Sequence, residues 1–176
     1  MSLASVLWLL PAVFMFHDLE EIIMVRTWIQ KNANVLRQRF PKLAMRVLPH
    51  AEKLSTSGFA LAVAEEFVIL TVLTFVAVEY ALYSMWTGMM LGFFLHLFFH
   101  IGQFLVMKKY TPGIWTCLPA GLYCAYALHV VQTTKLAKWD EIFVWTLIAL
   151  VILILNLLFA HLLGAKFDKF LDRHFS

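Results

Sequence analysis

The sequence predicts an all-α fold: a polytopic membrane bundle of five transmembrane helices. The chain is 62% hydrophobic and 14% charged, with a mean hydropathy of +0.80. Soluble domains are only about half apolar and about a quarter charged. Five apolar stretches also reach the roughly 20 residues that a helix needs to cross a bilayer core about 30 Å thick. We expect the spans at residues 3–25, 58–78, 82–107, 114–133 and 142–165 of a single domain, 1–176.

The first expected span, 3–25, begins near the N-terminus. No basic segment precedes it, and it runs into charged residues instead of a small-residue cleavage site. A secretory signal peptide has both of those features. We therefore expect this span to be retained as a transmembrane helix.

A polar segment, 26–57, follows the first span. Its apolar residues recur near helical spacing among many basic ones, as with Trp28, Ile29 and Phe40. This pattern predicts an amphipathic cytoplasmic segment on the membrane surface, with its bases near anionic lipid. A solvated helical hairpin between Arg26 and Ser57 is the alternative.

The remaining spans are strongly apolar and are separated by short connections. Cys117 and Cys124 lie seven residues apart in the span 114–133. That spacing indicates neither a metal site nor a disulfide framework, so we expect both cysteines to pack in the core. The third span, 82–107, carries Gly88 and Gly92, which would let a neighbouring helix approach closely.

The distribution of basic residues predicts the orientation. With the N-terminus outside, twelve of the fourteen Lys and Arg residues fall on the cytoplasmic side, and only Lys135 and Lys138 lie outside. The positive-inside rule therefore favours an N-out and C-in arrangement.

A polar cluster interrupts the first span. The stretch FHDLEEII contains His17, Glu20 and Glu21 shortly before Arg26. At helical rise these side chains lie about 7 to 14 Å inside the cytoplasmic face. Offsets of three and four residues bring all three onto one face of the helix. Asp18 points away from Glu20, and we assign it no role.

Two further spans carry polar residues at similar depth. Glu65 and Glu66 lie about 12 to 14 Å inside, and His96 and His100, four residues apart, lie at about 12 to 18 Å. Three helices thus bring a set of carboxylates and imidazoles to one level of the inner leaflet. The expected site consists of His17, Glu20, Glu21, Glu65, Glu66, His96 and His100.

This cluster requires a compensating cation. A charged side chain at the membrane centre costs about 2.5 to 3.5 kcal/mol even on insertion scales, and the carboxylates would repel one another. No Lys or Arg lies at that depth. Protons or a metal ion must then compensate the charge. Carboxylate with imidazole is the ligand mixture of zinc, iron or manganese. We expect a divalent metal, zinc or iron. The number of candidate ligands favours two ions over one, as in bundle-embedded carboxylate sites.

Other polar residues fit the cluster less well. His129 lies near the outer end of its span, where hydrogen-bonded packing is the expected role. His161 lies near the edge of the correct leaflet and is a possible outer hydrogen-bond donor or additional ligand.

The motifs in this chain resemble those of a known family. HDLEE at residues 17–21 and YTPG at residues 110–113, with further intramembrane histidines between them, are similar to the HXXEE family of small bacterial membrane proteins. The resemblance implies that His17, Glu20 and Glu21 are family positions, together with Tyr110, Pro112 and Gly113. His96 or His100 would be the additional histidine. It also implies a bacterial cytoplasmic membrane location, but no reaction.

The metal site suggests an intramembrane metalloenzyme that acts on a lipid-like or membrane-embedded substrate by hydrolysis or oxidation. The histidines would be ligands. The candidate ligands or general bases are Glu20, Glu21, Glu65 and Glu66. The expected partners are membrane lipid and such a substrate, with no nucleic acid.

Three other functions stay open. Metal-ion or proton binding and transport would use the same ligands. Haem ligation by His17 with His96 or His100 is disfavoured by the surplus of carboxylates. The paired glutamates are also similar to those of prenyl-protease-type intramembrane glutamate proteases, which carry EExxxR. Glu20, Glu21 and Arg26 have one residue more between them, so we rank this resemblance low.

Overall fold

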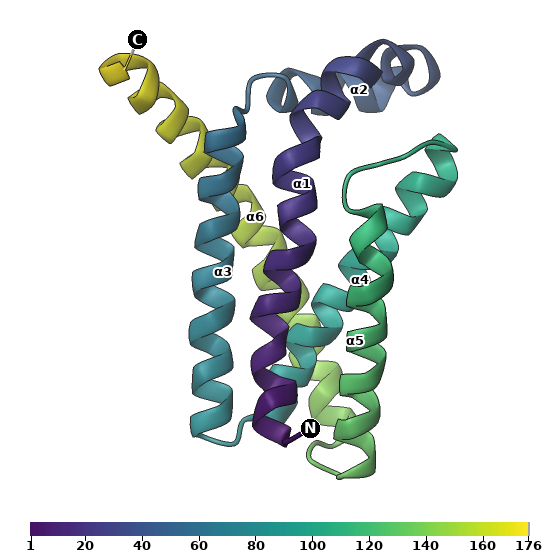
Figure 1. Cartoon of the computed structure of the whole chain (residues 1–176), viewed down its shortest axis with the longest axis vertical. Coiled ribbons are helices and arrows are strands. Elements are labelled where there is room, and N and C mark those ends of the chain that lie inside the picture. The colour runs from purple at the N-terminus through teal and green to yellow at the C-terminus, as the bar shows by residue number, and fades with distance from the viewer. Residues whose placement is uncertain (176) are drawn as a thin grey trace.

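A computed structural model describes residues 1–175, apart from the side chains of Leu157, His161 and Phe175. The possible role of His161 therefore lies outside the described residues. Over this range the chain forms six helices (Figure 1). They are α1 (Leu3–Arg39), α2 (Pro41–Ala51), α3 (Thr56–Glu79), α4 (Tyr83–Met107), α5 (Ile114–Thr133) and α6 (Trp139–Phe175).

The long helices alternate in direction, and α2 lies across one end of the bundle (Figure 1). The N-terminus and the α3–α4 and α5–α6 connections lie at one end. The α4–α5 connection, α2 and the C-terminus lie at the other. This order brings the basic segments together at the α2 end, as the predicted topology requires. The N-out orientation itself stays a prediction.

Four helices are long and apolar enough to cross a membrane: α3, α4, α5 and α6. These correspond to the last four predicted spans. Within the described residues α1 is not among them. The count of five spans therefore stays a prediction for α1.

The first helix does not end near Val25, as the predicted span boundary implied, but continues to Arg39. Charged and polar residues such as Arg26 and Lys31 end an apolar stretch without ending a helix. Helix breakers are Gly and Pro, and after Pro11 the next of these is Pro41, which begins α2.

Of the two interpretations of residues 26–57, the structure contains a helical hairpin made of the end of α1 and α2. Ile29 and Ala33 pack against Ala44 and Leu48. An exposed ion pair between Arg37 and Glu52, 2.6 Å long, joins α1 to the residue that follows α2. Whether the outer face of this hairpin meets lipid or water stays a prediction.

The last helix also continues past its predicted limit of 165, through the basic tail. Its first half packs on α4 through glycine. A Cβ at Gly88 would lie 2.6 Å from the backbone of Trp145, whereas one at Gly92 would lie 3.7 Å from the Cβ of Ala149. The predicted close approach at the glycine face is therefore confirmed for α6.

The core of the bundle contains both cysteines. Cys117 and Cys124 are buried and free, as predicted. They pack with residues of α1 and α4, among them Leu10, Trp86 and Leu97. His129 does not share this environment: its side chain is exposed on α5, so the expected packing role is wrong.

Candidate metal centre

Four of the predicted site residues converge on one point between α1 and α4. His17 and Glu21 are one helical turn apart on α1, and His96 and His100 are one turn apart on α4. Each offers one ligand atom, and these atoms all lie within 4.8 Å of one another. The four residues form a group that could hold a metal ion, and we call them the His/Glu cluster.

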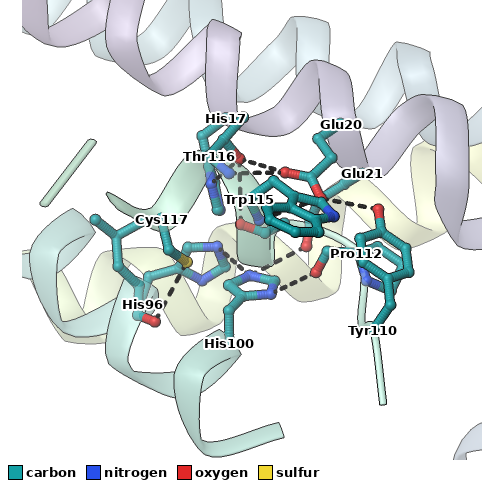
Figure 2. A network of polar contacts seen from close by, with 12 residues as sticks. His17, Glu20, Glu21, His96, His100, Tyr110, Pro112, Trp115, Thr116 and Cys117 are labelled. Atoms are coloured by element: carbon teal, nitrogen blue, oxygen red, sulfur yellow. Dashed lines mark hydrogen bonds and ion pairs between the residues drawn. The ribbon is translucent and has the colours of Figure 1, made fainter. Parts of the chain in front are cut away.

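The cluster is compact and shielded. His100 Nε2 lies 2.9 Å from His96 Nε2 and 3.1 Å from Glu21 Oε1. The ring of His17 meets both other rings edge to face, with centroids 5.5 Å and 5.0 Å away. His17 is fully buried and His100 is 4% exposed. Figure 2 shows the rings turned toward one another from the two helices.

A hydrogen-bond chain fixes the protonation of His17. Its Nδ1 lies 2.9 Å from Thr116 Oγ1. That hydroxyl has one proton, which it donates to Glu20 Oε2 at 2.7 Å or to the Gly113 carbonyl oxygen at 3.1 Å. Both of these oxygens can only accept, because one belongs to a carboxylate and the other to a backbone carbonyl. The hydroxyl must then accept from His17, so Nδ1 carries the proton and Nε2 carries a lone pair.

His100 is fixed in the same way. Its Nδ1 donates to the Pro112 carbonyl oxygen at 3.0 Å, because that oxygen only accepts. The neutral ring then presents a lone pair at Nε2, toward His96 and Glu21. Backbone and carboxylate partners of this kind orient metal-bound histidines and set their tautomer.

The cluster therefore contains more nitrogen and oxygen lone pairs than protons that could form hydrogen bonds with them. One proton between the Nε2 atoms of His96 and His100 would satisfy that pair. His17 Nε2, however, is buried and has no hydrogen-bond partner among the described residues. A buried polar atom without a partner costs about 1 to 3 kcal/mol. A cation bound by all four residues would remove this cost, whereas a shared proton would not.

Glu20 does not belong to the cluster, because it binds the start of α5. Its carboxylate accepts from the backbone N–H groups of Thr116 at 2.9 Å and Trp115 at 3.4 Å. The N-cap Gly113 has no side chain to offer, so Glu20 supplies the acceptor that the helix start needs. Tyr110 also donates to Glu20, at 2.8 Å. Burial, together with this bond, raises the pKa of Tyr110 above its ordinary value.

The α4–α5 connection packs directly on the cluster, which explains its glycine. Gly113 has φ +85°, a left-handed conformation that favours glycine. A Cβ there would lie 2.9 Å from His100 Nδ1 and 3.1 Å from His17 Cε1. The HDLEE and YTPG motifs therefore build a single site: Tyr110 donates to Glu20 (Figure 2), and Gly113 lies against the ring of His17.

The unexpected extension of α1 holds this connection in place. Trp28 Nε1 donates to the Tyr110 carbonyl at 2.6 Å. Arg39 donates to the carbonyls of Val106 and Met107, at 3.3 Å and 3.4 Å, at the end of α4. These bonds satisfy carbonyl groups that a helix end or loop leaves free. The part of α1 beyond Val25 thus positions the backbone that holds His100.

A cavity of about 310 Å³ adjoins the cluster between α1, α3, α4 and α6. Glu21 and His96 line it, whereas His17 and His100 do not. Asp18, Glu66 and Asn156 also line it at this level, and most of its other lining residues are apolar. The cluster is therefore accessible from one side, through two of its four members.

The remaining predicted site residues lie outside the group of four. Glu66 lines the cavity, and Glu65 accepts from Asn156 Nδ2 at 3.1 Å. The predicted roles of Glu20, Glu65 and Glu66 as ligands or bases, and a second ion, stay predictions.

Sequence reasoning missed two residues. Asp18 is 4% exposed and lines the cavity beside Glu21. Its offset of three from Glu21 places both on one face and could have indicated this. Thr116 joins Glu20 to His17, and no sequence pattern marked it, since a threonine early in a membrane helix is common.

Comparisons with known proteins agree with the motif-based expectation. A family model described as "Protein of unknown function with HXXEE motif" matches residues 8–128. Comparison with curated proteins and with solved structures gave no match. The match covers α2, α3 and α4 in full and most of α1 and α5, and it contains the entire His/Glu cluster. The chain belongs to the HXXEE family.

Proposed function

We propose that this member of the HXXEE family is an intramembrane metalloenzyme. His17, Glu21, His96 and His100 bind one divalent ion, and the site acts on a lipid-like substrate by hydrolysis or oxidation. The single observation that carries the proposal is His17 Nε2. It is a buried lone pair without a partner among the described residues, and it belongs to a ring whose other nitrogen is held by Thr116.

The donor set favours zinc or iron over calcium or magnesium. Three imidazole nitrogens and one carboxylate suit borderline transition metals, whereas calcium and magnesium prefer oxygen ligands. Four protein ligands would complete a tetrahedral zinc site. On an ion with six-coordinate preference, such as iron(II), they would leave two positions for substrate or water. A catalytic role therefore favours iron.

The surroundings of the cluster support a reaction inside the membrane. A divalent ion with an open position activates water for hydrolysis or, as iron, oxygen for oxidation. Glu21 and His96 face the cavity, so the open position would be on that side. Asp18 and Glu66 line the same region and are candidates to move a proton there.

The lining of the cavity favours an enzyme over a transporter. An ion pathway needs polar groups along its length. The residues that line the cavity toward the α3–α4 connection are apolar, for example Leu73 and Met85. We expect the metal to be a resident cofactor with slow exchange. The site would lie in the cytoplasmic half of a bacterial inner membrane.

Elemental analysis of the detergent-purified protein from metal-replete cells tests the proposal. We expect about one zinc or iron per chain, and loss of that metal in His17→Ala and Glu21→Gln. His129→Ala is the matched control, because His129 is exposed on α5 outside the cluster. Metal-free wild-type protein, or equal metal in wild type and the two cluster variants, would overturn the proposal. Two ions per chain would contradict the single-ion assignment.

A further inference from the structure

We infer that α2 attaches the bundle to the membrane surface. Its Leu43 and Val47 insert into the leaflet at the α2 end of the bundle, which is the cytoplasmic leaflet in the predicted topology. Its Lys42 and Arg46 bind the head groups of anionic phospholipid in that leaflet. This inference is independent of the proposed function, because it concerns the hairpin of α1 and α2 and no residue of the His/Glu cluster.

The buried seam between the two helices divides the hairpin into two sides. The seam consists of Ile29 and Ala33 of α1 with Ala44 and Leu48 of α2. The two helices run in opposite directions and are joined at Phe40 (Figure 1). Successive residues of an α-helix are about 100° apart. In an antiparallel pair, residues that are rotated in the same sense from the seam therefore lie on the same side.

One side of the hairpin faces the bundle. Trp28 and Arg39 of α1 lie on this side, since they donate to backbone carbonyls of the α4–α5 connection and of the end of α4. Leu43 and Val47 of α2 lie four residues apart, about a quarter turn from the seam in the same sense, and we call them the apolar stripe. The stripe is therefore on the side that faces the bundle. Its two side chains are 56% and 49% exposed, so the protein covers only part of each.

The opposite side of the hairpin carries Met45. Its side chain lines a small cavity together with Arg37 and Glu52, and these two residues form the exposed ion pair. Such a pair belongs in water or among head groups, because burying charge in hydrocarbon is costly. Met45 is 72% exposed on this side and therefore faces water. The two sides of α2 thus differ in their surroundings, although both carry exposed apolar residues.

The hairpin lies at the level of the bilayer surface. Trp28 contacts the α4–α5 connection and Arg39 contacts the end of α4, and both α4 and α5 are long and apolar enough to cross a membrane. α2 lies across this end of the bundle (Figure 1). An amphipathic helix in that position buries its apolar face at the boundary between head groups and acyl chains. The apolar stripe therefore meets the lipid beside the bundle.

The charge of α2 indicates the kind of lipid. Lys42 and Arg46 are exposed and lie one helical turn apart on the edge of α2 that points away from the seam. α2 contains no Asp or Glu, and Glu52, which follows it, is already paired with Arg37. Basic groups close to the membrane surface attract anionic phospholipid. The two bases adjoin the apolar stripe, so insertion of the stripe places them among the head groups.

Spin labels on the full-length protein, in nanodiscs that contain phosphatidylglycerol, test the insertion. The labels are attached at Leu43→Cys, Val47→Cys and Met45→Cys, since the native Cys117 and Cys124 are buried. Oxygen concentrates in lipid, whereas a nickel chelate stays in water. We expect the ratio of oxygen to nickel collisions to be severalfold higher at the two stripe positions than at the Met45 position, which is their matched control. Equal ratios, or a higher ratio at the Met45 position, would overturn the inference. Spin–spin broadening at the stripe would also overturn it, because a second copy of the chain would then cover these residues.

Titration of phosphatidylglycerol into the delipidated protein, followed by native mass spectrometry, tests the role of the bases. The double variant Lys42→Gln with Arg46→Gln should bind this lipid roughly 25-fold more weakly, which is about fivefold for each base. Lys135→Gln with Lys138→Gln is the matched control, because it removes two bases from the opposite end of the bundle. We expect it to keep the affinity of the wild type. An equal loss in both double variants, or no preference of the wild type for phosphatidylglycerol over phosphatidylcholine, would contradict binding of anionic lipid by α2.

Discussion

The Nδ1 atom of His17 lies 2.9 Å from the hydroxyl of Thr116, and that hydroxyl lies 2.7 Å from the carboxylate of Glu20. This relay joins α1 to the start of α5. It directs the free lone pair of His17 toward Glu21, His96 and His100. The two glutamates of the HxxEE motif therefore have different tasks: Glu21 belongs to the cluster, and Glu20 holds its support.

Thr116→Val should weaken metal binding without unfolding the protein. The methyl group keeps the volume of the side chain but cannot accept from His17 Nδ1, so the tautomer and ring orientation are no longer fixed. Loss of such a supporting partner costs roughly 10- to 100-fold in metal affinity. Competition with a chelator measures the affinity. Thr74→Val is the control, since Thr74 Oγ1 is buried without a hydrogen-bond partner among the described residues. Equal affinity in Thr116→Val and wild type would refute the relay.

Gly113→Ala should lower both stability and metal content. Its positive φ costs an L-residue about 1 to 2 kcal/mol, and the new methyl group would press on the rings of His100 and His17. Thermal unfolding and metal analysis of the same preparation measure the two effects. Gly102→Ala should leave the metal content unchanged and should not lower stability, because that position is open and alanine favours a helix over glycine. A Gly113→Ala protein with normal metal content would show that the connection does not position the histidines.

Tyr110 should make stability depend on pH in the alkaline range. Burial and the bond to Glu20 raise the pKa of Tyr110 in the folded protein. The folded state thus holds this proton more tightly than the unfolded chain. The contribution is complete below the unfolded value of about 10 and is lost as the pH rises above it.

The difference in melting temperature between wild type and Tyr110→Phe separates the contribution of Tyr110 from that of the lysine residues, which titrate in the same pH range. We expect wild type to be the more stable below about pH 10, and the difference to shrink above that value. A constant difference across the range would contradict the Tyr110–Glu20 bond.

Gly88→Val should separate α4 from α6. A Cβ at Gly88 would lie 2.6 Å from the backbone of Trp145, which cannot move as a flexible side chain would. Overpacking of this kind costs about 1 to 3 kcal/mol or more. Gly92→Ala is the matched control one turn away, where the nearest atom is at an ordinary 3.7 Å. Melting temperatures in detergent measure both variants, and equal values would refute the packing of α4 on α6.

The convergence of histidines and glutamates was predictable because helix periodicity and insertion depth are both regular. Counting residues from the membrane ends placed His17, His96 and His100 at one level, and offsets of four placed each helix's members on one face. Counting residues does not decide which of the two glutamates belongs to the cluster. Whether Glu20 or Glu21 faces α4 is decided by the rotation of α1 and by the start of α5, which competes for Glu20.

The extent of α1 was not predictable from hydropathy. Arg26 ends the apolar stretch, but nothing in the following residues ends the helix before Arg39. The continuation matters for the site, since Trp28 and Arg39 hold the α4–α5 connection. A hydropathy pattern indicates where a helix leaves the membrane and carries little information about where the helix stops.

X-ray absorption at the metal edge of the purified wild-type protein tests the metal centre most directly. We expect nitrogen and oxygen neighbours at about 2.0 to 2.2 Å, with the outer-shell scattering of three imidazole rings, and one ring fewer in His96→Ala. A spectrum with sulfur neighbours at about 2.3 Å, or one with oxygen neighbours and no imidazole scattering, would contradict a site built from His17, Glu21, His96 and His100.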